Sequence, residues 1–187
     1  MRIEKLVTDY GVDLHWVYFP LHPETAEAGM TLEELFAGRN MDIPAMQAHL
    51  KNLMEQEGLS FSDRTMTFNS RLAQELAKWA DGLPEGKKAH TALYHAYFVE
   101  GKNIGKIDEL LTITEKAGLD VKEARDVLEN RRFKNQVDQD WIHAYEMNIT
   151  GVPAFVAGQF IVSGAQPYKT LERMMQHAGI SKRVHTL

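Results

Sequence analysis

The sequence predicts an α/β fold in which strands near both ends of the chain enclose a long helical block. Residues 12–19 alternate and then become wholly apolar, as a strand in the middle of a sheet does. Residues 31–130 carry the apolar spacing of helices almost throughout. Two apolar runs, 152–156 and 160–162, are separated by turn-forming residues, and this pattern predicts an antiparallel hairpin.

The amino-acid composition and net charge exclude several classes of protein function. The chain has 187 residues, of which 44% are hydrophobic, enough for one domain or for one domain with a sizeable insertion. Its net charge of −5 argues against a nucleic-acid or anionic-membrane surface, and no apolar run is long enough to cross a bilayer. Residues 1–20 lack the pattern of a signal peptide, so we expect a cytoplasmic protein.

Cysteine and histidine limit the chemistry. The sequence contains no cysteine, which excludes disulfides, thiolate–metal sites and thiol nucleophiles among these 187 residues. Eight histidines are present, but no His-x-x-x-His pair has a neighbouring acid, so we expect no metal site. The sequence therefore assigns no catalytic residue.

The first elements follow from spacing and stop signals. Residues 2–10 place apolar side chains on one helical face, with Gly11 positioned to end the helix. The strand predicted at 12–19 is stopped by Pro20 and Pro23.

The helical block is divided by capping signals. These are the Thr31–Glu34 capping box, Asp42 before Pro44, Asn69, and the Asp120–Glu123 pair. The predicted helices after Asn69 include about 87–100, 106–117 and 133–147.

The end of the chain changes character. After the predicted hairpin at 152–162, residues 163–167 are expected to form a loop. Apolar spacing then predicts a closing helix over 168–178, and Gly179 is placed to end it. Strands at both ends with helices between them indicate a split α/β domain that carries a helical insertion.

The C-terminal residues resemble those of the DsbA-like thioredoxin-fold family. The resemblance is carried by Thr150–Val156 (TGVPAFV), by Phe160–Gln166 (FIVSGAQ) and by Asn69-Ser70-Arg71. It is strongest toward the FrnE-like and 2-hydroxychromene-2-carboxylate isomerase branch. It implies a thioredoxin-like fold with a large helical insertion, in which residues 1–40 and 131–187 form the thioredoxin-like domain and residues 41–130 the insertion.

The sequence departs from this family at its start. The family begins with a strand, a turn containing Cys-x-x-Cys or serine, and then the first helix, whereas a helix is predicted here from residue 2. We therefore expect the first strand and the active-site turn to be missing ahead of that helix. A naturally short chain, a start codon placed downstream of the true one, and a trimmed chain would all give this sequence.

The resemblance also implies the residues of a binding site. In the family a cis proline faces the reactive thiol, and the residue before it presents its backbone to an extended ligand. By resemblance these are Pro153 and Val152. Asn69 and Gln166 are two further candidates for ligand contact. The alternative for Asn69 is a helix cap, and the alternative for Gln166 is a solvated loop amide.

The implied function is thiol–disulfide oxidoreductase, with a thiol or disulfide protein as its substrate. Because these residues supply no thiol, we expect the chain as given to be inactive in that reaction. One alternative is a glutathione-dependent isomerase or transferase, of the 2-hydroxychromene-2-carboxylate isomerase or kappa type, in which glutathione brings the thiol. The other is a non-catalytic thioredoxin-like binding module. No cofactor other than glutathione is expected.

The missing strand would also affect assembly. Without it, the strand at 12–19 and the hairpin at 152–162 would flank a gap. Unpaired strand edges attract strands from other chains. We therefore expect a homo-oligomer, or a rearrangement that fills the gap.

Overall fold

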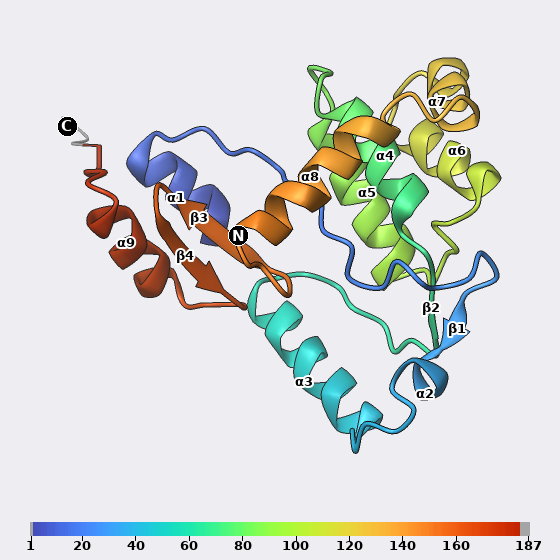
Figure 1. The fold of residues 1–187 in the computed structure, drawn as a ribbon, viewed down its shortest axis with the longest axis horizontal. Helices are drawn as coiled ribbons and strands as arrows, with labels where there is room; N and C mark the ends of the chain where they lie inside the picture. Colours follow the sequence, from blue (N-terminus) through green and yellow to red (C-terminus); the bar gives the residue numbers. More distant parts are fainter. Residues whose placement is uncertain (1, 184–187) are drawn as a thin grey trace. The chain divides into compact units, whose positions relative to one another are not determined.

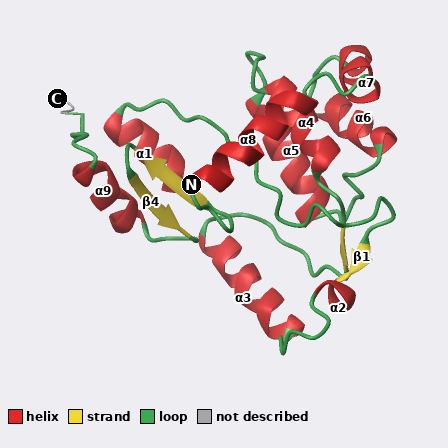
Figure 2. Ribbon diagram, viewed as in Figure 1, coloured by secondary structure: helices red, strands yellow, loops and turns green. Residues whose placement is uncertain are grey.

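A computed structural model describes residues 2–183, which fall into two compact units. Unit 1 contains the residues up to Leu21 and from Trp141 onward, and unit 2 is His22–Asp140. Within the described residues, strands form two separate two-stranded antiparallel sheets, and Figure 2 shows how few they are beside the helices. The fold class predicted from the sequence, α/β with a large helical part, is confirmed. The expected domain division, with an insertion at 41–130, stays a prediction.

Unit 1 is a hairpin with two helices on one face. Strands β3 (Ala154–Ala157) and β4 (Phe160–Ser163) pair antiparallel, from Ala154 opposite Ser163 to Ala157 opposite Phe160. Figure 1 shows helices α1 (Arg2–Tyr10) and α9 (Tyr168–His177) beside this hairpin. Alternate hairpin side chains face a core contributed by both helices. The buried residues of this core are Leu6, Tyr10, Leu171, Met174 and Met175.

Polar contacts also join α1 to the end of the chain. The Tyr168 hydroxyl donates to the Asp9 carboxylate at 2.5 Å, and the Arg183 N–H donates to the Asp9 carbonyl at 2.8 Å. Gly11 adopts a φ of 63° and donates to the Val7 carbonyl, so it ends α1 as predicted. The first and last elements of unit 1 are therefore held together by hydrogen bonds as well as by packing.

The prediction of a strand at residues 12–19 is wrong. This segment has no regular secondary structure, although its composition is that of a strand. A strand is stabilised by a hydrogen-bonded neighbour, and none of the described strands lies against this segment. Its apolar side chains are correspondingly exposed, including Leu14, Trp16 and Val17. The apolar pattern shows that a segment is compatible with a β-strand, but a strand also needs a neighbouring strand to which it can hydrogen-bond.

Unit 2 is mainly helical. Its first helices are α2 (Leu32–Leu35) and α3 (Ile43–Gln56). They are followed by α4 (Arg71–Ala80), α5 (Lys87–Phe98), α6 (Ile107–Lys116) and α7 (Val121–Glu129). Helix α8 (Lys134–Glu146) begins in unit 2 and ends in unit 1. Side chains of α4 to α7 form the core, in which Leu76, Leu110, Val127 and Leu128 are almost completely buried.

Most predicted caps are confirmed. Thr31 and Glu34 form a reciprocal capping box, and Asp42 accepts a hydrogen bond from the Ala45 N–H at 2.9 Å. Asp120 accepts from the N–H groups of Lys122 and Glu123. These side chains fix where the helices of unit 2 begin.

One feature of the helical block was not predicted. Strands β1 (Met30–Thr31) and β2 (Met66–Thr67) form a small antiparallel pair. The expectation that 31–130 is almost wholly helical is therefore wrong at these positions. Two-residue strands are too short to produce a periodic signal in the sequence.

Candidate functional site

The loop that leads into β3 carries the first candidate site. The Val152–Pro153 peptide bond is cis. The Pro153 carbonyl accepts a hydrogen bond from the Gly164 N–H at 2.7 Å, and strand pairing begins at the next residue, Ala154. The hairpin therefore fixes the position of Pro153.

Val152 lies at the surface, where the residue is 52% exposed. Within residues 2–183, neither the N–H nor the C=O of Val152 has a hydrogen-bond partner. An exposed, unpaired donor and acceptor on one residue is what an extended peptide needs to add as a strand.

Gln166 lies in the loop beside Pro153. Its side-chain Nε2 donates to the Ser163 carbonyl at 2.9 Å, and its own carbonyl accepts from Arg2 Nη1 at 2.9 Å. The first residue of α1 therefore contacts this loop. The structure thus brings the cis proline, the loop that contains Gln166, and Arg2 of α1 together in unit 1.

The chemistry that this arrangement offers is electrostatic. The N-terminal end of a helix carries partial positive charge and unpaired N–H groups, which favour a nearby anion such as a thiolate. The 187 residues include no cysteine, so such a thiolate would come from a ligand. Among the described residues there is no cluster of His, Asp or Glu that could hold a metal ion.

Asn69 lies in unit 2, and its side chain is engaged locally. The amide hydrogens bond to the carbonyls of Pro23 and Thr25, at 3.3 and 2.8 Å. Its Oδ1 accepts from the Arg71 N–H at 2.9 Å. Asn69 therefore fastens the loop at 23–25 to the start of α4, and Ser70 occupies the cap position itself. The expected ligand contact of Asn69 stays a prediction.

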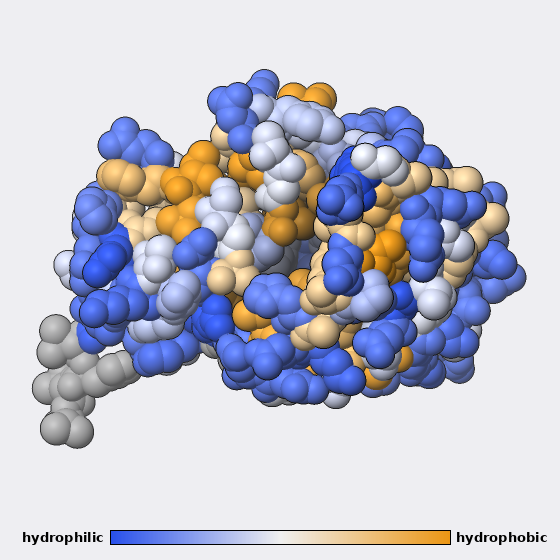
Figure 3. Space-filling view, turned by 90° about the horizontal axis from the view of Figure 1, so that it is seen from below, coloured by the Kyte–Doolittle hydropathy of each residue, from blue (hydrophilic) through white to orange (hydrophobic). Residues whose placement is uncertain are grey.

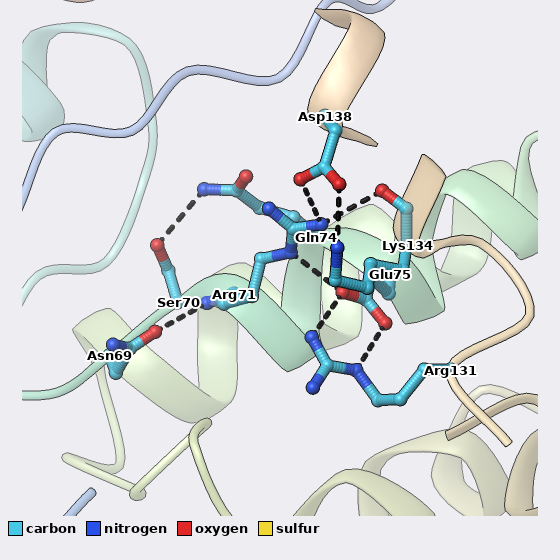
Figure 4. Close-up of polar contacts among 8 residues, drawn as sticks. All are labelled: Asn69, Ser70, Arg71, Gln74, Glu75, Arg131, Lys134 and Asp138. Carbon is cyan, nitrogen blue, oxygen red and sulfur yellow. Dashed lines mark hydrogen bonds and ion pairs between the residues drawn. The ribbon is translucent and has the colours of Figure 1, made fainter. Parts of the chain in front are cut away.

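Close to Asn69, two arginines share one buried carboxylate. Glu75 is fully buried. Arg131 binds it with two parallel hydrogen bonds of 2.7 and 2.6 Å, and Arg71 Nε adds a third at 2.6 Å. Figure 4 shows both guanidinium groups turned toward the Glu75 carboxylate. Burial acts to raise the pKa of Glu75, but the hydrogen bonds from Arg131 and Arg71 outweigh it and hold that pKa below its ordinary value.

This network extends to α8. Arg71 Nη2 donates to the Lys134 carbonyl at 2.8 Å and pairs with the Asp138 carboxylate at 2.7 Å. Hydrogen bonds from Lys134 and Arg71 lower the pKa of Asp138. Arg131 sits between α7 and α8 with a φ of 51°, a left-handed conformation that is unfavourable for arginine. Its bidentate bond to Glu75 compensates for that conformation.

Beside the network is a pocket of about 380 Å³. It lies where α4 and α6 begin, and all of its lining belongs to unit 2. The lining residues are Glu27, Asn69, Arg71, Leu72, Gly105, Ile107 and Arg131. Sequence reasoning missed this group. The spacing of four between Arg71 and Glu75 is a signal that could have indicated their pairing, whereas nothing local connects either residue to Arg131.

Exposed apolar side chains gather in unit 1. Among the described residues, the large exposed hydrophobic side chains lie in unit 1 with the exception of Met41. They include the cross-strand pair Val156 and Ile161 on the hairpin face that points away from the core. On the face drawn in Figure 3, hydrophobic residues reach the surface in several places among hydrophilic ones. No helix in residues 2–183 is long and apolar enough to cross a membrane.

The hairpin with its cis proline, the covering helices α1 and α9, and the helical unit define a thioredoxin-like protein. The model of the DsbA-like thioredoxin domain matches residues 1–176. The chain therefore belongs to the DsbA-like family, as its C-terminal residues indicated.

Known proteins agree with this assignment. The uncharacterized protein YwbO of Bacillus subtilis (strain 168) is 35% identical over 174 residues, which cover 91% of this chain and 84% of YwbO. A "probable DsbA oxidoreductase" of Streptomyces coelicolor matches with a TM-score of 0.84 and 26% identity, over 100% of this chain and 86% of that one.

A third similarity concerns the fold alone. A 2-hydroxychromene-2-carboxylate isomerase matches with a TM-score of 0.65 and 17% identity, over 95% of this chain and 85% of that structure. A DsbA-type protein and a 2-hydroxychromene-2-carboxylate isomerase are therefore both among the structural neighbours.

Proposed function

We propose that this DsbA-like protein binds extended thiol- or disulfide-containing peptides, glutathione among them, at the cis-proline loop. The observation that carries this proposal is Val152, directly before Pro153, which is exposed and whose backbone N–H and C=O have no partner in residues 2–183. The contact between Arg2 and Gln166 puts the start of α1 beside the same loop, where a ligand thiolate would be stabilised.

The protein's part in this proposal is binding and orientation. In thiol–disulfide exchange a thiolate attacks one sulfur of a disulfide, a new S–S bond forms, and the other sulfur leaves as a thiolate. Residues 1–187 contain no sulfur that can attack in this way. We therefore propose that these residues alone have no oxidoreductase activity. We propose that Val152, Pro153 and Gln166 contact the ligand.

A glutathione-dependent isomerase or transferase is the second candidate. The same loop and the same helix start would hold the ligand's own thiolate, so the lack of a protein thiol is no obstacle to this reaction class. If ligands bind but the protein catalyses neither isomerisation nor glutathione transfer, the protein is a non-catalytic binding module. We further propose a homo-oligomer, because apolar side chains are exposed in unit 1, and a cytoplasmic location.

Titration of the protein with reduced glutathione, followed by the backbone amide signals in NMR, tests the binding proposal. We expect saturable shifts at Val152, Gly164 and Ala165 at millimolar ligand. S-methylglutathione, which has no ionisable thiol, should bind more weakly because it cannot place a thiolate at α1.

Two variants with the same charge change make the test specific. Val152→Glu places a negative charge beside an anionic ligand and should weaken binding by about tenfold. Ile142→Glu adds the same charge at another exposed position of unit 1 and should leave binding unchanged. No saturable shift, or equal loss in both variants, would exclude the cis-proline loop as the binding site.

A further inference from the structure

The pocket at the starts of α4 and α6 takes no part in the proposed function. Its lining belongs wholly to unit 2, whereas the cis-proline loop belongs to unit 1. Its volume, about 380 Å³, suits a small molecule. The residues that line it combine opposite charges with an apolar surface, and this combination restricts the ligands that could fit.

Arg131 supplies the cationic side of the pocket. Its Nε and Nη2 atoms are used by Glu75, and its Nη1 has no hydrogen-bond partner among the described residues. Figure 4 shows this third nitrogen without a contact to the other residues drawn. Because Glu75 fixes the plane of the guanidinium group, Nη1 is a preorganised donor for a carboxylate.

Glu27 supplies the anionic side. Its carboxylate has neither a hydrogen bond nor an ion pair within the described part of the chain. Its backbone is fixed, because the Glu27 carbonyl accepts from Asn103 Nδ2 at 3.1 Å. An unpaired carboxylate on an anchored loop is a ready acceptor for an ammonium group.

The charges around the pocket balance. Two arginines and one glutamate line it, and the buried Glu75 binds both arginines, so a ligand with a net charge would leave the site unbalanced, whereas a zwitterion would not. The cations are Arg71 and Arg131, and the anions are Glu27 and Glu75.

The rest of the lining is apolar or closely packed. Leu72 and Ile107, from the first turns of α4 and α6, provide the apolar surface. Gly105 lies so close to Asn69 that an added Cβ would be 3.1 Å from the Asn69 carbonyl oxygen. A side chain at position 105 would therefore press on the loop that Asn69 holds.

We propose that this pocket binds a free α-amino acid with an aliphatic side chain. The ligand carboxylate pairs with Arg131, its ammonium group pairs with Glu27, and its side chain contacts Leu72 and Ile107. This site is independent of the cis-proline loop, and each of the two proposals can fail while the other stands.

L-leucine is the probe, and NMR titration of the backbone amides is the measurement. We expect saturable shifts at Leu72, Gly105 and Ile107, with no shift at Val152. N-acetyl-L-leucine lacks the ammonium group and L-leucinamide lacks the carboxylate. Each should bind about tenfold more weakly than L-leucine, because each loses one charged contact.

Glu27→Gln is the decisive variant, because Glu27 is exposed and its carboxylate has no partner within residues 2–183 whose loss would disturb the fold. It should weaken L-leucine binding by about tenfold while N-acetyl-L-leucine binds as before. Glu33→Gln makes the same charge change on α2, outside the pocket, and should have no effect. The proposal is overturned if L-leucine gives no saturable shift, if the three compounds bind equally, or if Glu33→Gln weakens binding as much as Glu27→Gln.

Discussion

At the scale of single residues, the contact between Tyr168 and Asp9 links α9 to α1. The hydrogen bond from Tyr168, followed by the one from Lys5, lowers the pKa of Asp9. Burial and the neighbouring Asp9 carboxylate raise the pKa of Tyr168, so its hydroxyl keeps its proton and continues to donate at neutral pH. The pair is therefore a charge-assisted hydrogen bond whose strength depends on the ionisation of Asp9.

Tyr168→Phe should make the stability of the protein less sensitive to acid. Because the folded-state pKa of Asp9 is lowered, its contribution is present above the unfolded-state pKa and is lost as pH falls through the folded-state pKa. The variant should therefore be less stable than the wild type near neutral pH, and this difference should shrink in strong acid. Urea unfolding over a pH series measures both. Tyr145→Phe, at an exposed tyrosine of unit 1, should show no such difference.

At the scale of elements, Glu75 joins three segments of unit 2. It lies on α4 and is bound by Arg131 from the segment before α8 and by Arg71 from its own helix, while Arg71 also contacts Lys134 and Asp138 of α8. The starts of α4 and α8 are therefore positioned by one buried carboxylate. Such a group is costly to change, because both guanidinium groups would lose their common partner.

Glu75→Gln should destabilise unit 2 by about 2 kcal/mol, a value below that for fully buried pairs because Arg131 is partly exposed. Since the pKa of Glu75 is lowered in the fold, the loss should be largest above the ordinary glutamate pKa and should diminish as pH falls through the folded-state value. Thermal unfolding at several pH values tests this. Glu129→Gln, which removes an exposed pair with Arg125, should cost less than about 0.5 kcal/mol. Equal effects of the two variants would contradict the assigned role of Glu75.

The sequence predicted those elements well whose formation depends on residues close together in the chain. The Thr31–Glu34 box, the Asp42 cap and the 160–162 strand depend on neighbouring residues, and the structure has them. The Glu75–Arg131 bond joins residues 56 positions apart, and no periodicity encodes it. At residues 12–19 the local signal was present but the strand did not form, because a segment of strand-like composition needs a hydrogen-bonding neighbour.

At the scale of the whole molecule, the distribution of exposed apolar side chains between the units is uneven. Much of the buried apolar surface of unit 2 lies in the core formed by α4 to α7, whereas unit 1 leaves one face of its hairpin, with Val156 and Ile161, uncovered by α1 and α9. An uncovered apolar face of this kind favours association, and a second copy of the chain presents the same face.

The proposed homo-oligomer leads to a mass measurement. Size-exclusion chromatography with light scattering should give at least twice the mass of one chain for the wild type. Val156→Asp with Ile161→Asp, on the uncovered hairpin face, should give the mass of a single chain. Met41→Asp changes a similarly exposed side chain of unit 2 and should leave the larger mass unchanged. A wild-type protein with the mass of one chain would refute the association.

The division of the chain between the units also sets an order of folding. Unit 2 is one continuous segment, His22–Asp140, in which α4, α5 and α6 each contact the next helix along the chain, with further contacts from α4 to α6 and α7. Contacts between consecutive helices form early in folding. Unit 1 needs residues from both ends, since α1 packs against α9 and Arg2 bonds to Gln166, 164 positions away. Its hairpin, cis-proline loop and binding surface should therefore form after the core of unit 2. Pulsed hydrogen exchange during refolding should accordingly protect α4 to α7 before β3 and β4.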